Sequence, residues 1–174
     1  IYGAAELARG IDLVTASVRR SPADVLDPRV KSLNYLTSVL AKLEARRRGA
    51  DEALLLNTAG EVAEASVANV FIYRGGELRT PPPTDGALEG ITRATVLELA
   101  GTLGIAACER TLGRFDLFSA DEVFLTGTGA GIVPVRSLDG QTVGEGVPGP
   151  ICAKLRSAFN DAAVSLGTPL HPQP

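Results

Sequence analysis

The stretch ALLLNTAGEVAEASVANVFIYRGGELRT, residues 53–80, decides the fold class of this chain. It contains four short runs of apolar and β-branched residues, at 53–57, 61–64, 67–73 and 78–80, and turn residues separate them. The pair Gly75-Gly76 between the last two runs is typical of a β-hairpin turn. Successive short strands separated by turns predict that this region belongs to a sheet.

The segments around this stretch mix strands and helices without a strict strand-helix-strand alternation and without an internal repeat. This predicts an α+β fold with a largely antiparallel or mixed sheet and flanking helices. A Pro-rich tail is expected at 168–174. Alternating or continuous apolar patterns predict further strands at 11–18, 105–111, 122–125 and 132–135. Apolar residues at helical spacing, followed by residues that end a helix, predict helices at 33–48, 92–103, 114–118 and 150–164.

The composition excludes several classes of protein. Twenty acidic and seventeen basic residues give a net charge of −3 without the basic balance of a nucleic-acid binder. The single histidine, His171, lies in the Pro-rich tail, so the sequence predicts neither a Ser-His-Asp mechanism nor a metal site. Any general base is therefore expected to be Lys, Glu, Asp or Tyr.

The cysteine content and the apolar runs indicate the compartment. The two cysteines, Cys108 and Cys152, are too few for a disulfide framework, which fits a reducing, cytoplasmic setting. No apolar run approaches the roughly twenty residues of a membrane helix, and no membrane partner is expected. The chain contains no methionine, even at position 1, so we expect a preceding N-terminal portion.

Lys31 is one of only three lysines, and it stands where an extended, proline-containing segment turns into a helix. A lysine at such a junction can project its amine into a cleft. The simpler interpretation is an exposed lysine at a loop-to-helix junction, because lysine is rarely buried.

Two glycine-containing stretches can bind an anion. Gly90-Ile91-Thr92 opens a helix, and free amide groups at a helix N-terminus suit a phosphate, although Thr92 could also be a simple N-cap. Gly127-Thr128-Gly129-Ala130-Gly131 lies between two predicted strands and is followed by Pro134, so it does not open a dinucleotide-binding helix. Its amides and the Thr128 hydroxyl can hold an anion, or the stretch can be a structural turn.

Glu64 completes a set of groups that matches one cofactor. A solvated glutamate is the common case, but here the carboxylate stands among small residues where two strands meet. Pyridoxal phosphate needs an amine for a Schiff base, a carboxylate for its ring nitrogen and backbone amides for its phosphate. Lys31, Glu64 and the two anion-binding turns supply these groups.

Five ordered motifs resemble the class IV aminotransferases, which are the fold-type IV pyridoxal phosphate enzymes. The motifs are Lys31-Ser32-Leu33-Asn34-Tyr35-Leu36, Glu64-Ala65-Ser66 with Asn69-Val70-Phe71, Thr80-Pro81-Pro82, Leu88-Glu89-Gly90-Ile91-Thr92-Arg93, and Glu122-Val123-Phe124-Leu125-Thr126-Gly127-Thr128. The resemblance implies the sheet or pseudo-barrel of this family's large domain over residues 1–167, without the small N-terminal domain, and a homodimer or higher homo-oligomer.

The resemblance also implies a role for each matching residue. Lys31 would form the Schiff base and shuttle protons, Glu64 would contact the pyridine nitrogen, and Tyr35 would bind the phenolic oxygen of the cofactor. Leu88 would pack on the ring. Phosphate and substrate carboxylate would be bound by the residues of the two turns, which are Gly90, Ile91, Thr92, Gly127, Thr128, Gly129 and Ala130.

The motifs look most like those of branched-chain amino acid aminotransferases. The implied reaction is ping-pong transamination of a branched-chain L-amino acid with 2-oxoglutarate, in amino-acid biosynthesis. D-amino acid transaminases and aminodeoxychorismate lyases of the same family are alternatives, as is a catalytically silent binding module. Ala65 stands where glycine is usual, and Gly129-Ala130-Gly131 replaces the usual Ala-Ala-Glu, which leaves the substrate preference open.

Overall fold

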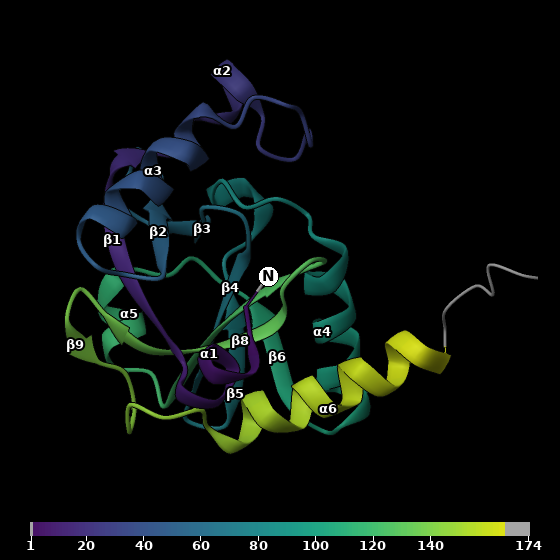
Figure 1. Cartoon of the computed structure of the whole chain (residues 1–174). Coiled ribbons are helices and arrows are strands. Elements are labelled where there is room, and N and C mark those ends of the chain that lie inside the picture. Colours follow the sequence, from purple (N-terminus) through teal and green to yellow (C-terminus); the bar gives the residue numbers. More distant parts are fainter. Residues whose placement is uncertain (1, 166–174) are drawn as a thin grey trace, which may run out of the picture.

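The computed structural model describes residues 2–165, and its centre is a mixed nine-stranded sheet (Figure 1). The strands follow the order β3-β2-β1-β8-β7-β4-β5-β6, and β9 pairs with β8. β1 is parallel to both β2 and β8, and β5 is parallel to β6, whereas the remaining pairs are antiparallel. The strand bounds are β1 Ile11–Arg19, β2 Glu52–Leu56, β3 Val62–Ala65, β4 Asn69–Arg74, β5 Glu77–Thr80, β6 Ala106–Glu109, β7 Glu122–Gly127, β8 Gly131–Leu138 and β9 Gln141–Thr142.

The prediction of an α+β fold with a mixed sheet is confirmed, and the flanking helices lie near their expected positions. Two short helices that the sequence did not indicate, α1 and α2, contain no buried residue. The helix bounds are α1 Ala4–Arg9, α2 Ala23–Leu26, α3 Leu36–Arg47, α4 Ile91–Thr102, α5 Arg114–Phe118 and α6 Pro150–Ser165, with a 3₁₀ turn, η1, at Pro83–Asp85. The predicted tail at 168–174 and His171 lie outside the described residues.

Side chains alternate between two buried faces of the sheet, so both faces have a core. Leu54 and Leu56 of β2 belong to the cluster that includes residues of α5, whereas Leu55 between them packs with the cluster beneath α3. On β4, Phe71 stacks on Phe124 of β7, with ring centroids 5.3 Å apart, in the cluster that contains residues of α4 and α6. Burial on both faces explains why β2 is a continuous apolar run instead of an alternating one.

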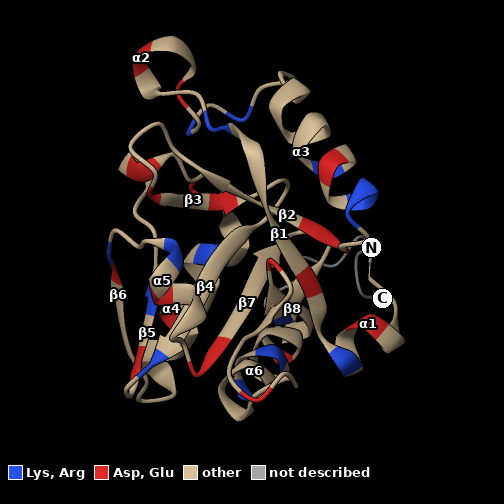
Figure 2. Cartoon of the chain, turned by 90° about the vertical axis from the view of Figure 1, so that its left-hand side faces the viewer, with Lys and Arg blue, Asp and Glu red and all other residues tan. Residues whose placement is uncertain are grey.

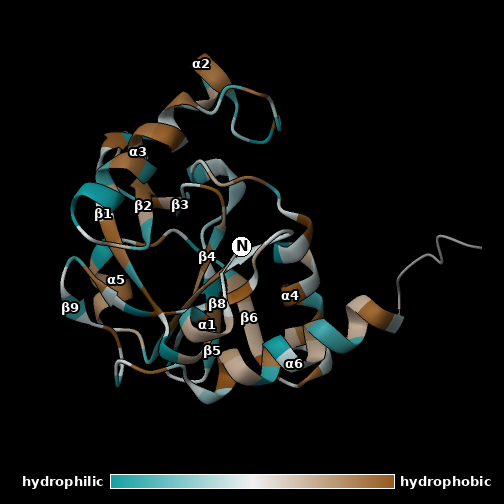
Figure 3. Ribbon diagram, viewed as in Figure 1, coloured by the Kyte–Doolittle hydropathy of each residue, from teal (hydrophilic) through white to brown (hydrophobic). Residues whose placement is uncertain are grey.

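Helix α3 packs on β1 and β2 through small residues, not through its large apolar ones. Ala41 and Ala45 are fully buried against the sheet. The leucines and valine whose spacing indicated this helix are exposed instead, and Figure 3 shows hydrophobic residues along α3. These exposed side chains, Leu36, Val39, Leu40 and Leu43, are called the α3 apolar face below.

The turns and the helix lengths agree with the sequence patterns. Gly75 and Gly76, between β4 and β5, have φ values of 58° and 88°, which glycine adopts without steric cost, so the predicted hairpin is confirmed. None of the helices within residues 2–165 has both the length and the apolar character that crossing a membrane requires.

Candidate functional site

A pocket of about 260 Å³ lies where four connecting segments meet at one end of the sheet. These segments are the loop between α2 and α3, the β3–β4 turn, the residues leading into α4, and the end of β7. The volume is slightly below the usual range for small-molecule sites, which begins at about 300 Å³. Nine of the predicted site residues line this pocket, namely Lys31, Tyr35, Glu64, Leu88, Gly90, Ile91, Thr92, Gly127 and Thr128. Gly129 and Ala130 are not among its lining residues.

Lys31 lies in the loop that precedes α3; it is exposed and lines the pocket. Its Nζ donates a hydrogen bond of 3.4 Å to the Tyr35 Oη one helical turn further along. The amine is therefore accessible, and it is paired with a hydroxyl rather than with a carboxylate. A solvent-accessible amine in a pocket can react with a carbonyl ligand.

Glu64 on β3 is buried, with 4% of its surface exposed, and polar groups surround its carboxylate. Arg20 donates to Oε1, while the Asn69 side chain and the Leu88 amide donate to Oε2 at 3.1 and 3.0 Å. Burial raises the pKa of Glu64, and the Arg20 guanidinium and the Leu88 amide oppose that rise. The structure thus holds a carboxylate at the pocket wall in one fixed orientation.

Asn69 connects this carboxylate to the segment that leads into α4. Its amide nitrogen also donates to the Leu88 carbonyl at 2.8 Å, so one side chain ties β3, β4 and the Leu88 backbone together. A methyl group at Gly90 would overlap the Asn69 side-chain oxygen. Glycine at position 90 is therefore required for the close approach of this backbone to Asn69.

The first residues of α4 line the pocket. Gly90 is the N-cap, Ile91 is the first helical residue, and no side chain caps this end. Thr92 is thus the second residue of the helix and not its N-cap, so the alternative interpretation of Thr92 as a simple cap is wrong. An uncapped helix N-terminus that lines a pocket suits an anion.

The glycine-rich stretch after β7 is a hairpin turn, as the sequence predicted. Gly127 pairs with Gly131, and the Ala130 amide donates to the Gly127 carbonyl at 3.1 Å. Just before this turn, the buried Thr126 side chain has an Oγ1 atom without a hydrogen-bond partner among the described residues. A buried hydroxyl without a partner is uncommon in folded proteins, and this one belongs to a residue of the pocket lining.

The sequence predicted no role for Arg20, Asn69 or Thr126. Asn69 and Thr126 stand inside the recognised motifs, which was an available signal. Arg20 directly follows β1 and gives no local signal, because its contact with Glu64 depends on how β1 and β3 are placed in the sheet.

Charged residues of both signs lie around the pocket. Figure 2 shows basic segments in the loop that follows α2 and an acidic segment on β3. Within residues 2–165, no group of three or more His, Cys, Asp or Glu side chains is placed to hold a metal ion. The pocket therefore offers an amine, a buried carboxylate and anion-binding amides.

Known proteins share this fold and sequence over most of the chain. The family described as Amino-transferase class IV matches residues 2–138. A relative from Methanocaldococcus jannaschii is 49% identical over 158 residues, which cover 91% of this chain and 55% of the relative. The branched-chain-amino-acid aminotransferase of Escherichia coli (strain K12) is 44% identical, with 90% and 51% covered.

A solved structure agrees equally well. The T.th. branched-chain amino acid aminotransferase complexed with N-(5'-phosphopyridoxyl)-L-glutamate superposes with a TM-score of 0.89 at 41% identity, covering 91% of this chain and 53% of that one. The chain spans about half the length of the relatives it matches. Because the family match covers well over half of its residues, the chain belongs to the class IV aminotransferases.

Proposed function

We propose that residues 1–167 form the large domain of an aminotransferase and bind pyridoxal 5'-phosphate in the pocket described above. The observation that carries this proposal is the meeting of three groups in one pocket: the Lys31 amine, the buried Glu64 carboxylate and the uncapped N-terminus of α4. These are the groups that an aldehyde, a pyridine nitrogen and a phosphate require.

The residues present fit this cofactor. Only glycine at position 90 lets the α4 N-terminus lie this close to Asn69, and this contact brings the amides of Ile91 and Thr92 to the pocket wall. The Thr126 hydroxyl lacks a protein partner among the described residues, so it remains available to a bound polar group.

Each pocket residue then has a role in binding or proton transfer. When bound, pyridoxal phosphate supplies an aldehyde that captures an amine and a protonated ring that accepts electrons from the substrate. Lys31 Nζ would hold the aldehyde group and would move a proton at the substrate α carbon. Glu64 would keep a proton on the ring nitrogen, and Tyr35 Oη would donate to the ring oxygen. The Leu88 side chain would pack on the ring.

The two turns hold the anionic groups. The Ile91 and Thr92 amides and the Thr128 hydroxyl would bind the phosphate, and Gly90 and Gly127 would let the backbone approach it. Gly129 and Ala130 would reach the carboxylate of the substrate, although they do not line the pocket formed by this chain. This assignment rests on their place in the β7–β8 turn, next to Thr128.

The reaction that we propose is the ping-pong transfer of an amino group from a branched-chain L-amino acid to 2-oxoglutarate. The identity of 44% to the Escherichia coli branched-chain-amino-acid aminotransferase supports the donor class. The L-glutamate part of the ligand in the T.th. structure supports the acceptor, because transamination of 2-oxoglutarate yields glutamate.

Absorbance spectroscopy of the full-length protein tests the cofactor and its attachment. With pyridoxal phosphate, the wild type should show the visible band of covalently bound cofactor, and Lys31→Ala should lose it. The control is Lys154→Ala, because this exposed lysine on α6 lies outside the pocket lining. A wild type without the band, or a band that persists in Lys31→Ala, would contradict the proposal.

Parallel assays with leucine, D-alanine and aminodeoxychorismate test the substrate. We expect turnover of leucine with 2-oxoglutarate. Turnover of either other compound in its place would assign the protein to a different activity within the family.

We further propose that the protein acts in the cytoplasm and assembles with a second copy of itself. Its cysteines, Cys108 and Cys152, are both free thiols, as in reducing compartments. The α3 apolar face leaves large aliphatic side chains exposed, of which Leu36 is 65% exposed, and such patches favour protein contacts.

A further inference from the structure

Arg20 is a charged residue that contacts the Glu64 carboxylate directly. It immediately follows β1, and its amide donates to the Leu56 carbonyl at 2.9 Å, which fixes the start of its side chain to the end of β2. Its Nη2 donates to Glu64 Oε1, and its Nε donates to the Gly86 carbonyl at 3.2 Å. The guanidinium is therefore held through two of its nitrogen atoms, Nε and Nη2, and 19% of the side chain is exposed.

We propose that Arg20 is a positioning residue that keeps the Glu64 carboxylate ionised and aimed into the pocket, so that Glu64 can hold a proton on a bound pyridine ring. This inference rests on the proposed function, because it concerns the same cofactor. Arg20 would affect the cofactor by holding Glu64, without contacting the cofactor itself.

The other cations near Glu64 are engaged elsewhere. Lys31 and Arg93 also face this carboxylate and favour its charged form, Lys31 from the loop before α3 and Arg93 from α4. The Lys31 amine lies against the Tyr35 hydroxyl, and Arg93 pairs with Glu109 and donates to the Pro81 carbonyl. Among the described residues, Arg20 alone forms an ion pair with Glu64.

Burial makes this pairing necessary. Removing a carboxylate from water favours its neutral form, and burial is the largest influence that raises the pKa of Glu64. The Arg20 charge is the largest influence in the opposite direction. A neutral Glu64 would carry its own proton and could not stabilise a proton on a ring nitrogen.

The backbone beside Arg20 is shaped to admit its side chain. Gly86 has a φ of 105°, and a methyl group there would come within 3.1 Å of the Arg20 Cγ atom. Glycine thus allows the arginine stem to lie along this turn on its way to Glu64. The path of the guanidinium is defined by contacts from β2, η1 and β3 together.

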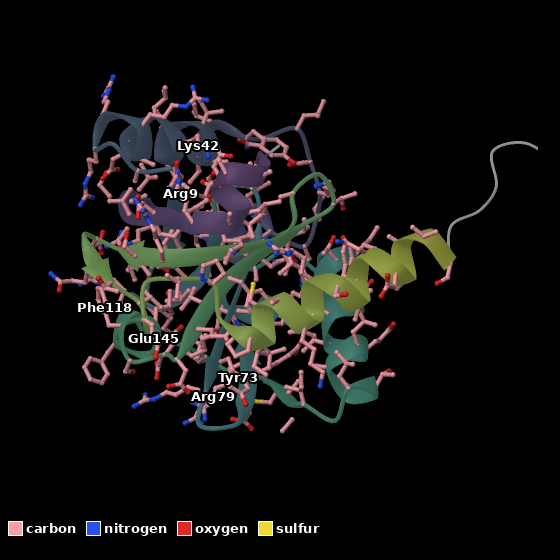
Figure 4. The ribbon with its side chains drawn as sticks, turned by 60° about the horizontal axis from the view of Figure 1, so that its bottom comes forward. Arg9, Lys42, Tyr73, Arg79, Phe118 and Glu145 are labelled. Carbon is pink, nitrogen blue, oxygen red and sulfur yellow. The ribbon has the colours of Figure 1, made fainter. Side chains whose placement is uncertain are left out.

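Cofactor affinity as a function of pH tests the proposal in the full-length protein. Pyridoxal phosphate is titrated into wild type, Arg20→Gln, Arg20→Lys and Arg79→Gln, and binding is followed by absorbance. Arg79 is the matched control: it is also 19% exposed and ion-paired, to Glu77, and Figure 4 places it on the opposite side of the molecule from Lys42 of α3.

Arg20→Gln should bind about tenfold more weakly than wild type near neutral pH, and this deficit should shrink as the pH rises and Glu64 ionises again. Arg20→Lys should restore the pH profile of the wild type, since it retains the charge. Arg79→Gln should match wild type at every pH. Unchanged affinity and an unchanged pH profile in Arg20→Gln would overturn the proposal.

A double variant separates action through Glu64 from direct binding of the cofactor. In a Glu64→Gln background, Arg20→Gln should cause no further loss of affinity. A loss of equal size in both backgrounds would mean that Arg20 contacts the ligand itself, and would overturn the proposal. If Arg20→Gln alone fails to fold, the double variant should fold, because no unpaired buried charge remains; an unfolded double variant would contradict the proposal.

The outcome also separates this inference from the proposed function. A wild type that binds no pyridoxal phosphate refutes the proposed function. A wild type that binds it through Lys31, with an Arg20→Gln variant that behaves identically, refutes only the role of Arg20.

Discussion

At the scale of single residues, the Asn69 side chain connects two walls of the pocket. One amide group holds both Glu64 and the Leu88 backbone, and the lack of a side chain at Gly90 allows this arrangement. The Glu64 carboxylate and the N-terminus of α4 are thereby coupled, although they come from segments far apart in the sequence. A substitution at Gly90 should therefore affect both the Glu64 carboxylate and the N-terminus of α4.

Gly90→Ala should weaken cofactor binding by about tenfold or more, because the added methyl group displaces Asn69 and loosens the carboxylate hydrogen bonds. The control is Gly101→Ala within α4, where no atom lies within 4 Å of the added methyl group. That change should raise the free energy of unfolding by up to about 1 kcal/mol. Absorbance titration and urea unfolding measure both effects; equal affinities in the two variants would contradict this account.

The buried Glu64 should also make the stability of the cofactor-free protein depend on pH. Its pKa is raised on folding, so its contribution to stability is complete below the ordinary value of 4.5 and is lost as the pH rises through the raised value. Wild type should therefore lose stability relative to Glu64→Gln as the pH increases.

Urea unfolding at a series of pH values measures this difference. Asp12 provides a control of opposite sign, because the hydrogen bond from Arg136 lowers its pKa. The contribution of Asp12 is present above its ordinary pKa and is lost as the pH falls, so Asp12→Asn should differ from wild type mainly at higher pH. A Glu64→Gln variant that follows wild type at all pH values would show that the carboxylate is not desolvated.

At the scale of secondary-structure elements, the N-terminus of helix α6 binds a buried carboxylate of the sheet. Glu122 of β7 accepts hydrogen bonds from the Ile151 and Cys152 amides at 2.9 and 2.8 Å, at the positive end of the helix. A methyl group at Gly149 would overlap the Glu122 side chain, so the close approach requires glycine there. The contact attaches the longest helix of the described chain to β7.

Glu122→Ala should lower the free energy of unfolding by about 2–3 kcal/mol, because two amides at a buried helix end lose their acceptor. Glu145→Ala is the control, since this residue, labelled in Figure 4, is exposed and precedes the same helix. Denaturant unfolding measures both variants. A loss in Glu122→Ala no larger than that in Glu145→Ala would contradict the assigned role.

Elements that are determined by their own residues could be predicted from the sequence. Features that depend on contacts with distant parts of the chain could not. Gly75 and Gly76 specify their hairpin by themselves, and α5 begins and ends at the predicted residues. Helices α1 and α2 were missed because they bury no side chain and so leave no apolar pattern. The burial of Ala41 instead of the leucines of α3 could not be predicted, since helical spacing does not reveal which face meets the sheet.

The same limit applies to the candidate site. Lys31, Glu64 and the α4 N-terminus could be proposed from residue type, local pattern and resemblance, and the structure brings them to one pocket. Arg20 could not, because its partner lies 44 residues away and meets it only through the strand order β3-β2-β1. Whether each residue has its proposed role stays a prediction.

On the scale of the whole molecule, the α3 apolar face predicts association of two copies. Replacing Leu36 and Leu40 with glutamate should weaken this association, because charges would be buried at the contact. The unfolding free energy should change by less than about 1 kcal/mol, since both side chains are already exposed. Val164→Glu on α6, another exposed aliphatic residue, is the control.

Size-exclusion chromatography with light scattering measures the result. Wild type and Val164→Glu should have the mass of a dimer or a higher oligomer, and the double glutamate variant a smaller one. Three identical masses would show that another surface forms the contact.

The central place of β8 in the sheet determines when the two parts of the sheet can pair during synthesis. Lys31 and Glu64 belong to the part that ends at β1, Asn69 and Thr126 to the part that ends at β7, and β8 lies between β1 and β7. Until the ribosome has released Leu138, β1 and β7 each present an unpaired edge that can pair with a neighbouring chain. All the proposed cofactor-contacting residues, up to Thr128, are therefore made before the strand that joins the two parts of the sheet.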